Sequence, residues 1–413
     1  ILEALEGDDT VTLIAQVDAD SFVVNGGDPG GSDVLLLSGA AGVAETVTIA
    51  PDATNPTEQD VTGLGASIDV SGVELIRYTG DGGDDTLRVV PGAGDHAVRV
   101  DNGPEPLTDR VTSDALPEIH FTDLLNFVVD EDSQIGNIVA TFVTGSLAGA
   151  INYQTILDGE DTLVIEGSDG AADNFRVSHP VGVPVVAVTD VASGVTVADL
   201  GTGVPSPLGR LQINTLGGDD MVTVDNSTGL INVPITYDGG SGSDTLLVTG
   251  TTAVQQVEYF PGPDVLEGRL AYSLTWGPPP SRDMVIDFIN LEPVIDLVPK
   301  TIALTVYGTN ADNAINYTEG PNSGVVSLLN PLGLVTGLVS VDAYETIEFA
   351  NFTGPDDVLE IIALAGDDVV NLNNPTTPAG LERIWVEGND PTASDKVIVT
   401  GTSGADTVTI DTL

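Results

Sequence analysis

Aspartates that follow glycine-rich turns are the residues of this sequence whose types and spacing could do chemistry. Residues 237–248 read YDGGSGSDTLLV, with Gly239, Gly240 and Gly242 ahead of Asp244. Glycines let the backbone turn through positive φ and leave room for carbonyl oxygens to face an ion. An aspartate carboxylate adds a hard oxygen ligand of the kind that calcium prefers. We therefore predict Ca²⁺ as the cofactor of this turn.

The same turn recurs along the chain in degenerate form. Gly-Asp-Asp precedes four β-type runs, in which the second aspartate is Asp9, Asp85, Asp220 or Asp368. Another aspartate heads a further run 24 residues later in the first three cases and 27 residues later in the fourth. These later aspartates are, in the same order, Asp33, Asp109, Asp244 and Asp395.

A spacing of 24 residues predicts one coil of a stacked fold, so each pair would bring two carboxylates together. Their repulsion would be relieved by protonation of one carboxylate or by a cation between the two. Only one aspartate of a doublet can serve a given ion, because side chains alternate along a strand. The alternative is that Gly and Asp are present only as turn formers. The predicted metal ligands are Asp244, Gly240, Gly242, Asp220, Asp219, Asp85, Asp84, Asp109, Asp33, Asp9, Asp368 and Asp395.

From Gly239 onward the sequence fits the nonapeptide GGxGxDxLx at every specified position. In this it resembles the calcium-binding β-roll repeats of RTX type, found in very large secreted bacterial surface and adhesin-type proteins. The resemblance implies β-roll coils, bound calcium and an extracellular location. The chain departs from that family because its motif is solitary and its relatives are scattered, whereas RTX nonapeptides follow one another directly.

Nearly every segment of the chain reads as a β-strand. Thr10-Val11-Thr12-Leu13 alternates polar and apolar residues, and Gly, Pro, Asn and Asp interrupt such runs every eleven or twelve residues. No amphipathic helix of convincing length is predicted. Further strands are predicted over residues 34–38, 45–49, 73–78, 162–166, 173–177, 211–214, 303–307, 312–315, 345–352, 396–400 and 406–410.

Two all-β architectures fit these strands. The 24-residue inner period and the low aromatic content of 5% favour a parallel β-solenoid with β-roll-like coils. The irregular longer period favours the alternative, tandem Ig-like β-sandwiches with inserted loops. We expect the solenoid.

The recurrences divide the chain into three repeats and their connections. The rigid stretch Thr275-Trp276-Gly277-Pro278-Pro279-Pro280 is the strongest boundary signal. Residues 1–49 match 366–410, including Asp28-Pro29 against Asp390-Pro391, so we expect a longer tandem array or head-to-tail tiling. The predicted segments are 1–33 (a partial repeat), 34–113 (repeat 1), 114–161 (linking), 162–250 (repeat 2), 251–302 (linking) and 303–413 (repeat 3).

The charge excludes several classes of partner. With 63 acidic and 11 basic residues the net charge is −52, which repels nucleic acid and disfavours anionic membrane surfaces. The longest uncharged runs are broken by Gly, Pro and Asn, so we predict no membrane span. The chain has no cysteine, and calcium or high salt could neutralise its acidity in place of disulfide stabilisation.

These features predict an extracellular structural protein, secreted or at the cell surface, that assembles with copies of itself into a layer, filament or stalk. The second hypothesis is an adhesin whose residues 114–161 and 251–302 recognise surface glycans, with Tyr259, Phe260 and Trp276 as stacking candidates. The third is a polysaccharide-active β-helix enzyme.

We expect no enzymatic activity, because the aspartate pairs recur in one frame whereas an active site is unique. Arg77, Arg88, Arg99 and Arg110 recur every eleven residues, which is the rhythm of strand and turn and not of a substrate clamp. No nucleophile motif accompanies the histidines, which are His96, His120 and His179.

Overall fold

The computed structural model describes residues 1–4, 6–15, 20–27, 32–132, 136–179, 186–201, 208–389 and 394–401. Within these ranges the protein is all-β, and its only regular helix is a single 3-10 turn, Thr144–Ser146. The strand predicted at 406–410 and the dipeptides Asp28-Pro29 and Asp390-Pro391 lie outside the described residues.

The chain forms two compact units. Unit 1 comprises Ile1–Ser168 and Pro180–Asn214, and unit 2 comprises Asp169–His179 and Thr215–Leu413. The predicted boundary at residues 275–280 does not separate them, because this stretch joins two antiparallel strands inside unit 2.

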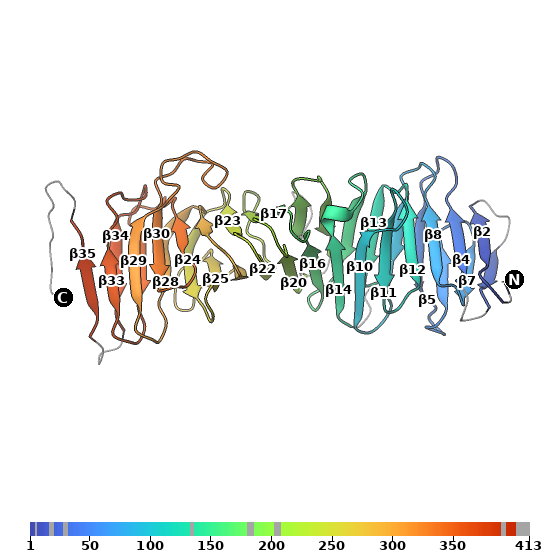
Figure 1. Ribbon diagram of the computed structural model, residues 1–413, viewed down its shortest axis with the longest axis horizontal. Helices are drawn as coiled ribbons and strands as arrows, with labels where there is room; N and C mark the ends of the chain where they lie inside the picture. Colours follow the sequence, from blue (N-terminus) through green and yellow to red (C-terminus); the bar gives the residue numbers. More distant parts are fainter. Residues whose placement is uncertain are drawn as a thin grey trace. The chain divides into compact units, whose positions relative to one another are not determined.

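Unit 1 contains two sheets built from parallel ladders. In the first sheet one ladder is β2 (Thr10–Ile14), β4 (Val34–Ser38), β8 (Leu75–Thr79) and β12 (Glu118–Thr122). Neighbours such as β4 and β8 run side by side in Figure 1. A second ladder is β10 (His96–Asn102), β14 (Ile138–Val143), β16 (Thr162–Glu166) and β20 (Arg210–Asn214). The antiparallel strand β11 (Asp109–Ser113) joins the two ladders by pairing with both β10 and β12.

The second sheet of unit 1 repeats this plan. One ladder is β1 (Leu2–Glu3), β3 (Ser21–Asn25) and β7 (Ser67–Ser71). The other is β5 (Thr46–Pro51), β9 (Thr86–Val89), β13 (Asn126–Asp130), β15 (Asn152–Ile156) and β19 (Thr196–Asp199). Antiparallel β6 (Gln59–Thr62) joins them, and β18 (Val186–Asp190) pairs with β19.

Unit 2 is built in the same way. Its first sheet holds β22 (Ile235–Asp238), β26 (Met284–Ile289), β24 (Val254–Pro261), β28 (Lys300–Tyr307), β32 (Val358–Ile362) and β34 (Arg383–Glu387), joined by antiparallel β25 (Glu267–Ser273). Its second sheet holds β17 (Asn174–Ser178), β21 (Met221–Asp225), β23 (Thr245–Thr249), β27 (Val294–Asp296), β31 (Ile347–Phe349), β29 (Ala314–Glu319), β33 (Val369–Leu372) and β35 (Lys396–Val399), joined by antiparallel β30 (Gly337–Val341).

The chain therefore coils between two sheets, and the expected solenoid-like architecture is confirmed. A plain coil is 24 residues long: Thr10 pairs with Val34 in one unit and Met221 with Thr245 in the other. Where an antiparallel strand is inserted the coil lengthens, so that β8 follows β4 by 41 residues. The irregular longer period thus reflects inserted strands and not separate sandwiches.

Apolar residues at alternate positions of each strand fill the space between the sheets. In β4 the side chains of Leu35 and Leu37 are buried while their neighbours are half exposed. Phe127 packs among Phe121, Phe142 and Tyr153, with ring centroids 4.5, 6.4 and 6.2 Å away. Burial of each such side chain contributes roughly 1.5–3 kcal/mol, so the core is the main source of stability.

Candidate metal centre

The aspartates predicted as metal ligands lie at corners where the chain enters a strand. We call Asp33, Asp85, Asp220, Asp244 and Asp368 the corner aspartates, since each immediately precedes a strand and is at most 2% exposed. The outer members of the doublets, such as Asp84 and Asp219, are exposed. The alternation expected from the sequence is therefore present, with one carboxylate of each doublet pointing inward.

Consecutive coils are tied together by pairs of aspartates, in an arrangement that we call the reciprocal clamp. Asp244 Oδ1 accepts the backbone N–H of Asp220, one coil earlier, at 2.9 Å. In return, Asp219 Oδ1 accepts the N–H of Ser243 at 3.1 Å. Hydrogen bonds to charged acceptors contribute about 1.5–3 kcal/mol each, so one clamp fixes the register of two coils.

The clamp recurs at three further corners. Its members are Asp8 and Asp9 with Ser32 and Asp33, Asp312 and Asn313 with Asp367 and Asp368, and Asp367 and Asp368 with Ser394 and Asp395. Each aspartate of a Gly-Asp-Asp doublet thus has its own backbone partner, which accounts for the doubling. The predicted stacking of Asp9 with Asp33, Asp220 with Asp244 and Asp368 with Asp395 is confirmed by the strand pairings that follow them.

The predicted stacking of Asp109 on Asp85 is wrong. Asp85 precedes β9, whose parallel neighbours are β5 and β13, and its Oδ1 accepts the N–H of Glu45 at 2.9 Å. Asp109 instead begins the inserted antiparallel strand β11, where it accepts hydrogen bonds from the Tyr153 hydroxyl and the Ala148 N–H. The shared spacing of 24 residues is coincidental there, because an inserted strand lies between them.

The second carboxylate oxygen of most corner aspartates is buried without a partner among the described residues. This holds for the Oδ2 atoms of Asp33, Asp220, Asp244 and Asp368. Burial raises the pKa of Asp244 to about 6, with the charge of nearby Asp220 adding to the effect. These corners are therefore places where a proton or a cation would be stabilised.

The glycines of the motif leave space for neighbouring coils. A Cβ on Gly239 would lie 2.7 Å from Asp244 Oδ2, and one on Gly242 would lie 1.5 Å from the carbonyl oxygen of Gly218. A Cβ on Gly240 would lie 2.1 Å from the Leu216 carbonyl oxygen. Close packing of coils thus requires glycine at Gly240 and Gly242, whose role as carbonyl ligands remains a prediction.

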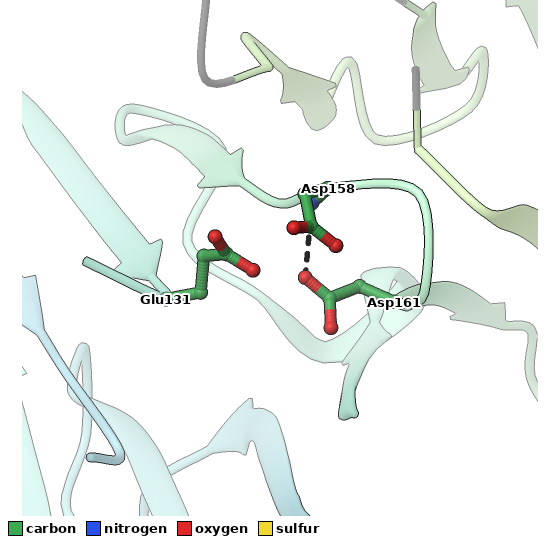
Figure 2. A group of neighbouring side chains, drawn as sticks. All are labelled: Glu131, Asp158 and Asp161. Atoms are coloured by element: carbon green, nitrogen blue, oxygen red, sulfur yellow. Dashed lines mark hydrogen bonds between the residues drawn. The ribbon is translucent and has the colours of Figure 1, made fainter. Parts of the chain in front are cut away.

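A second acidic cluster, which the sequence did not indicate as a site, lies in unit 1. We call Glu131, Asp158 and Asp161 the acidic triad; Figure 2 shows their carboxylates facing one another. One carboxylate oxygen from each residue lies within 4.8 Å of the other two. Glu131 directly follows β13, and both aspartates lie between β15 and β16, so the parallel pairing of β13 with β15 brings them together.

Hydrogen bonds hold the two aspartates of the triad in place. Asp161 accepts the N–H of Asp158 at 2.9 Å and the N–H of Ile138 at 2.7 Å, each through a different oxygen. Asp158 accepts the N–H of Glu160 at 3.0 Å. Burial, and then the neighbouring Asp161, raise the pKa of Glu131 to about 8. The signal in the sequence was two acidic runs, 130–132 and 158–161, lying one coil apart.

The arginines and aromatic residues considered for substrate binding are engaged in structural contacts. Tyr259 is fully buried, so its predicted role in glycan stacking is wrong. Phe260 is covered on one face by Tyr307 and on the other by Arg282, whereas Trp276 is 57% exposed. The four evenly spaced arginines form ion pairs, namely Arg77 with Glu105, Arg88 with Asp130 and Asp132, Arg99 with Asp101 and Glu166, and Arg110 with Asp101.

The chain matches no family model, and no curated protein matches it significantly. Among the described residues no helix has the length and apolar character needed to cross a membrane.

Proposed function

We propose that this protein is an extracellular structural protein, a calcium-stabilised chain of β coils that associates with copies of itself in a surface layer, filament or stalk. The observation that carries this proposal is the reciprocal clamp, which recurs at equivalent corners in both units. Recurrence in one frame favours a structural role, since a catalytic or ligand-binding site is ordinarily unique. The likeness of residues 239–247 to an RTX nonapeptide supports calcium as the stabilising ion.

The corner aspartates provide the chemical reason for a cation. Their unpartnered Oδ2 atoms lie inside an already very acidic chain, where a carboxylate without a counter-charge destabilises the folded state. A calcium ion or a shared proton would remove that penalty. We propose calcium at these corners, with the proton as the competing occupant at low pH.

An uncharged loop of unit 2 supports self-association. Residues 320–336 connect β29 to β30, and Leu329 and Leu334 anchor the loop on a core formed by Leu247, Ile295, Leu297 and Ala350. The loop exposes four apolar side chains, Val325, Val326, Leu328 and Leu332, which are 54%, 74%, 78% and 58% exposed. Two copies of so acidic a chain can meet here without bringing carboxylates together.

The test compares the full chain in calcium and in EDTA at one fixed ionic strength. We expect millimolar calcium to raise the melting temperature seen by circular dichroism and to increase the sedimentation coefficient. Magnesium at the same concentration is the control for divalent charge alone. A chain that melts at the same temperature in both solutions and stays monomeric at high concentration would contradict the proposal.

The second candidate function is glycan adhesion by residues 251–302. In its favour are the exposed Trp276 and a half-open cavity of about 480 Å³ lined by Phe260, Arg269, Arg282 and Asp287. Deleting 251–302 would remove β24 to β27 and with them part of the core, so a point variant is the better test. Under this hypothesis Trp276→Ala abolishes retention on immobilised acidic polysaccharides while the melting temperature is unchanged.

A further inference from the structure

We propose that the acidic triad, Glu131, Asp158 and Asp161, binds one calcium ion in unit 1, at a site separate from the corner aspartates. This site does not depend on the structural role proposed above. It joins residues from two successive coils, so a bound ion would tie β13 to the connection between β15 and β16.

The donor atoms favour a hard cation. All three side chains offer carboxylate oxygens, and the triad contains no nitrogen or sulfur ligand of the type that zinc prefers. Oxygens bound to one calcium ion lie about 2.3–2.6 Å from it, which places any two ligands within roughly 5 Å of each other. The separations within the triad, all at most 4.8 Å, meet that limit.

Glu131 provides the independent sign that something is bound. The residue is 3% exposed, and its Oε2 has no hydrogen-bond partner among the described residues. Figure 2 shows its carboxylate directed at Asp158 and Asp161. A buried carboxylate that faces two others, with no donor to its second oxygen, is expected to attract a cation.

The neighbours of Glu131 show how this chain treats acids that need no metal. Arg88 lies between Asp130 and Asp132, with nitrogen–oxygen distances of 2.7 and 2.8 Å to their carboxylates. Glu131 points away from that arginine, and none of the ion pairs among the described residues includes a member of the triad. The acids flanking Glu131 are thus neutralised by protein, whereas the triad is not.

The triad is already ordered and can be reached from solvent. The N–H groups of Asp158 and Ile138 fix both oxygens of Asp161 and leave further lone pairs free. Asp158 is half-buried, which leaves a route for an ion and for water ligands. Asp199 adds negative charge nearby: it is 1% exposed, has an unpartnered Oδ2, and senses the charge of Asp161.

The experiment is isothermal titration of calcium into the chelator-treated full chain, with Glu131→Gln and Glu160→Gln variants. Glu160 is an exposed acid of the same turn and lies outside the triad, so its substitution removes the same charge without a ligand. We expect Glu131→Gln to remove one binding event, or to weaken it at least tenfold, while Glu160→Gln changes that event by less than threefold. Magnesium should bind there at least tenfold more weakly than calcium.

Thermal unfolding supplies a readout with opposite signs. In EDTA, Glu131→Gln should melt above the wild type because it removes an uncompensated buried charge. In millimolar calcium it should melt below the wild type because the ion is lost. Asp244→Asn, at a corner in unit 2, should keep the Glu131-dependent event, so failure of the corner sites and failure of the triad are distinguishable. Equal calcium binding by the wild type and Glu131→Gln, or no calcium binding by either, overturns the inference.

Discussion

At the scale of the residue, a glycine and an acid share one space at the corner of a coil. The position of a Cβ on Gly239 lies beside the carboxylate of Asp244, and Gly80 stands in the same relation to Asp85. Glycine is needed at such corners because the inward aspartate fills the volume that a side chain would take, and positive φ is not the cause at either residue.

We predict that Gly239→Ala destabilises unit 2 by about 2 kcal/mol or more, because the added methyl group must displace the carboxylate or the chain of the next coil. Urea unfolding followed by circular dichroism measures the change. Gly145→Ala is the matched control, since its Cβ would meet nothing closer than 3.8 Å. Equal effects of the two substitutions would show that the corner can relax.

Glu345 gives the stability a defined pH dependence. Burial raises its pKa to about 7, and hydrogen bonds from Thr346 and Val294 only partly oppose the shift. A folded-state pKa above the unfolded value means that the folded state holds the proton more tightly, so stability falls as pH rises from about 4.5 to 7. Glu345→Gln should flatten this fall and be more stable than the wild type at pH 8 by roughly 1–3 kcal/mol.

Unfolding curves at pH 5, 6, 7 and 8 test this prediction. Glu319→Gln, an exposed acid of the same unit, is the control. A constant difference between wild type and Glu345→Gln across this range would mean that the carboxyl does not titrate there.

At the scale of the element, the plain coil and the inserted antiparallel strand explain what the sequence could and could not predict. The strands, the 24-residue coil and the stacking of Asp220 on Asp244 follow from local alternation and from one repeated spacing. The place of Asp109 does not, because an inserted strand changes the neighbour of a residue without changing its spacing. Nor does the acidic triad, since Glu131 and Asp161 meet only through the register of β13 with β15.

The loop 320–336 yields a prediction about assembly. Asn330, fully buried, holds the loop by donating to the carbonyl oxygens of Asn322 and Leu334 and accepting the N–H of Leu334. Its outward apolar residues should therefore act as a fixed surface. We expect the double variant Val326→Asp, Leu328→Asp to weaken self-association at least tenfold, because each aspartate adds like charge to the contact.

Sedimentation equilibrium in calcium measures this effect, and an unchanged melting temperature shows that the fold is kept. Leu107→Asp, at an exposed leucine of unit 1, controls for added charge away from the loop. If both variants associate as the wild type does, the contact between copies lies elsewhere.

At the scale of the whole molecule, a net charge of −52 must be accommodated together with two acidic interiors. Surface carboxylates repel one another over about 10 Å at 0.1 M salt, and salt shortens that distance. Buried carboxylates at the clamps and the triad are screened much less, so they require a specific occupant. General salt and calcium should therefore stabilise the chain by separate routes.

We predict that raising NaCl from 20 mM to 1 M in EDTA increases the melting temperature by several degrees, because surface repulsion is screened. Choline chloride should act in the same way, since screening is not specific to the cation. Calcium should add a further increase at 1 M NaCl. The absence of that increment would assign the acidity to the surface alone.

The reciprocal clamp also bears on how such a chain can grow. Because Asp220 and Asp244 occupy equivalent corners 24 residues apart, a duplication of residues 221–244 would insert one complete coil whose own aspartates meet both neighbours in register. Gene duplication in steps of this length would extend the protein without redesign of any contact, whereas steps of other lengths would break a clamp. The inserted antiparallel strands fit the same history, as later additions within coils whose corners were already fixed.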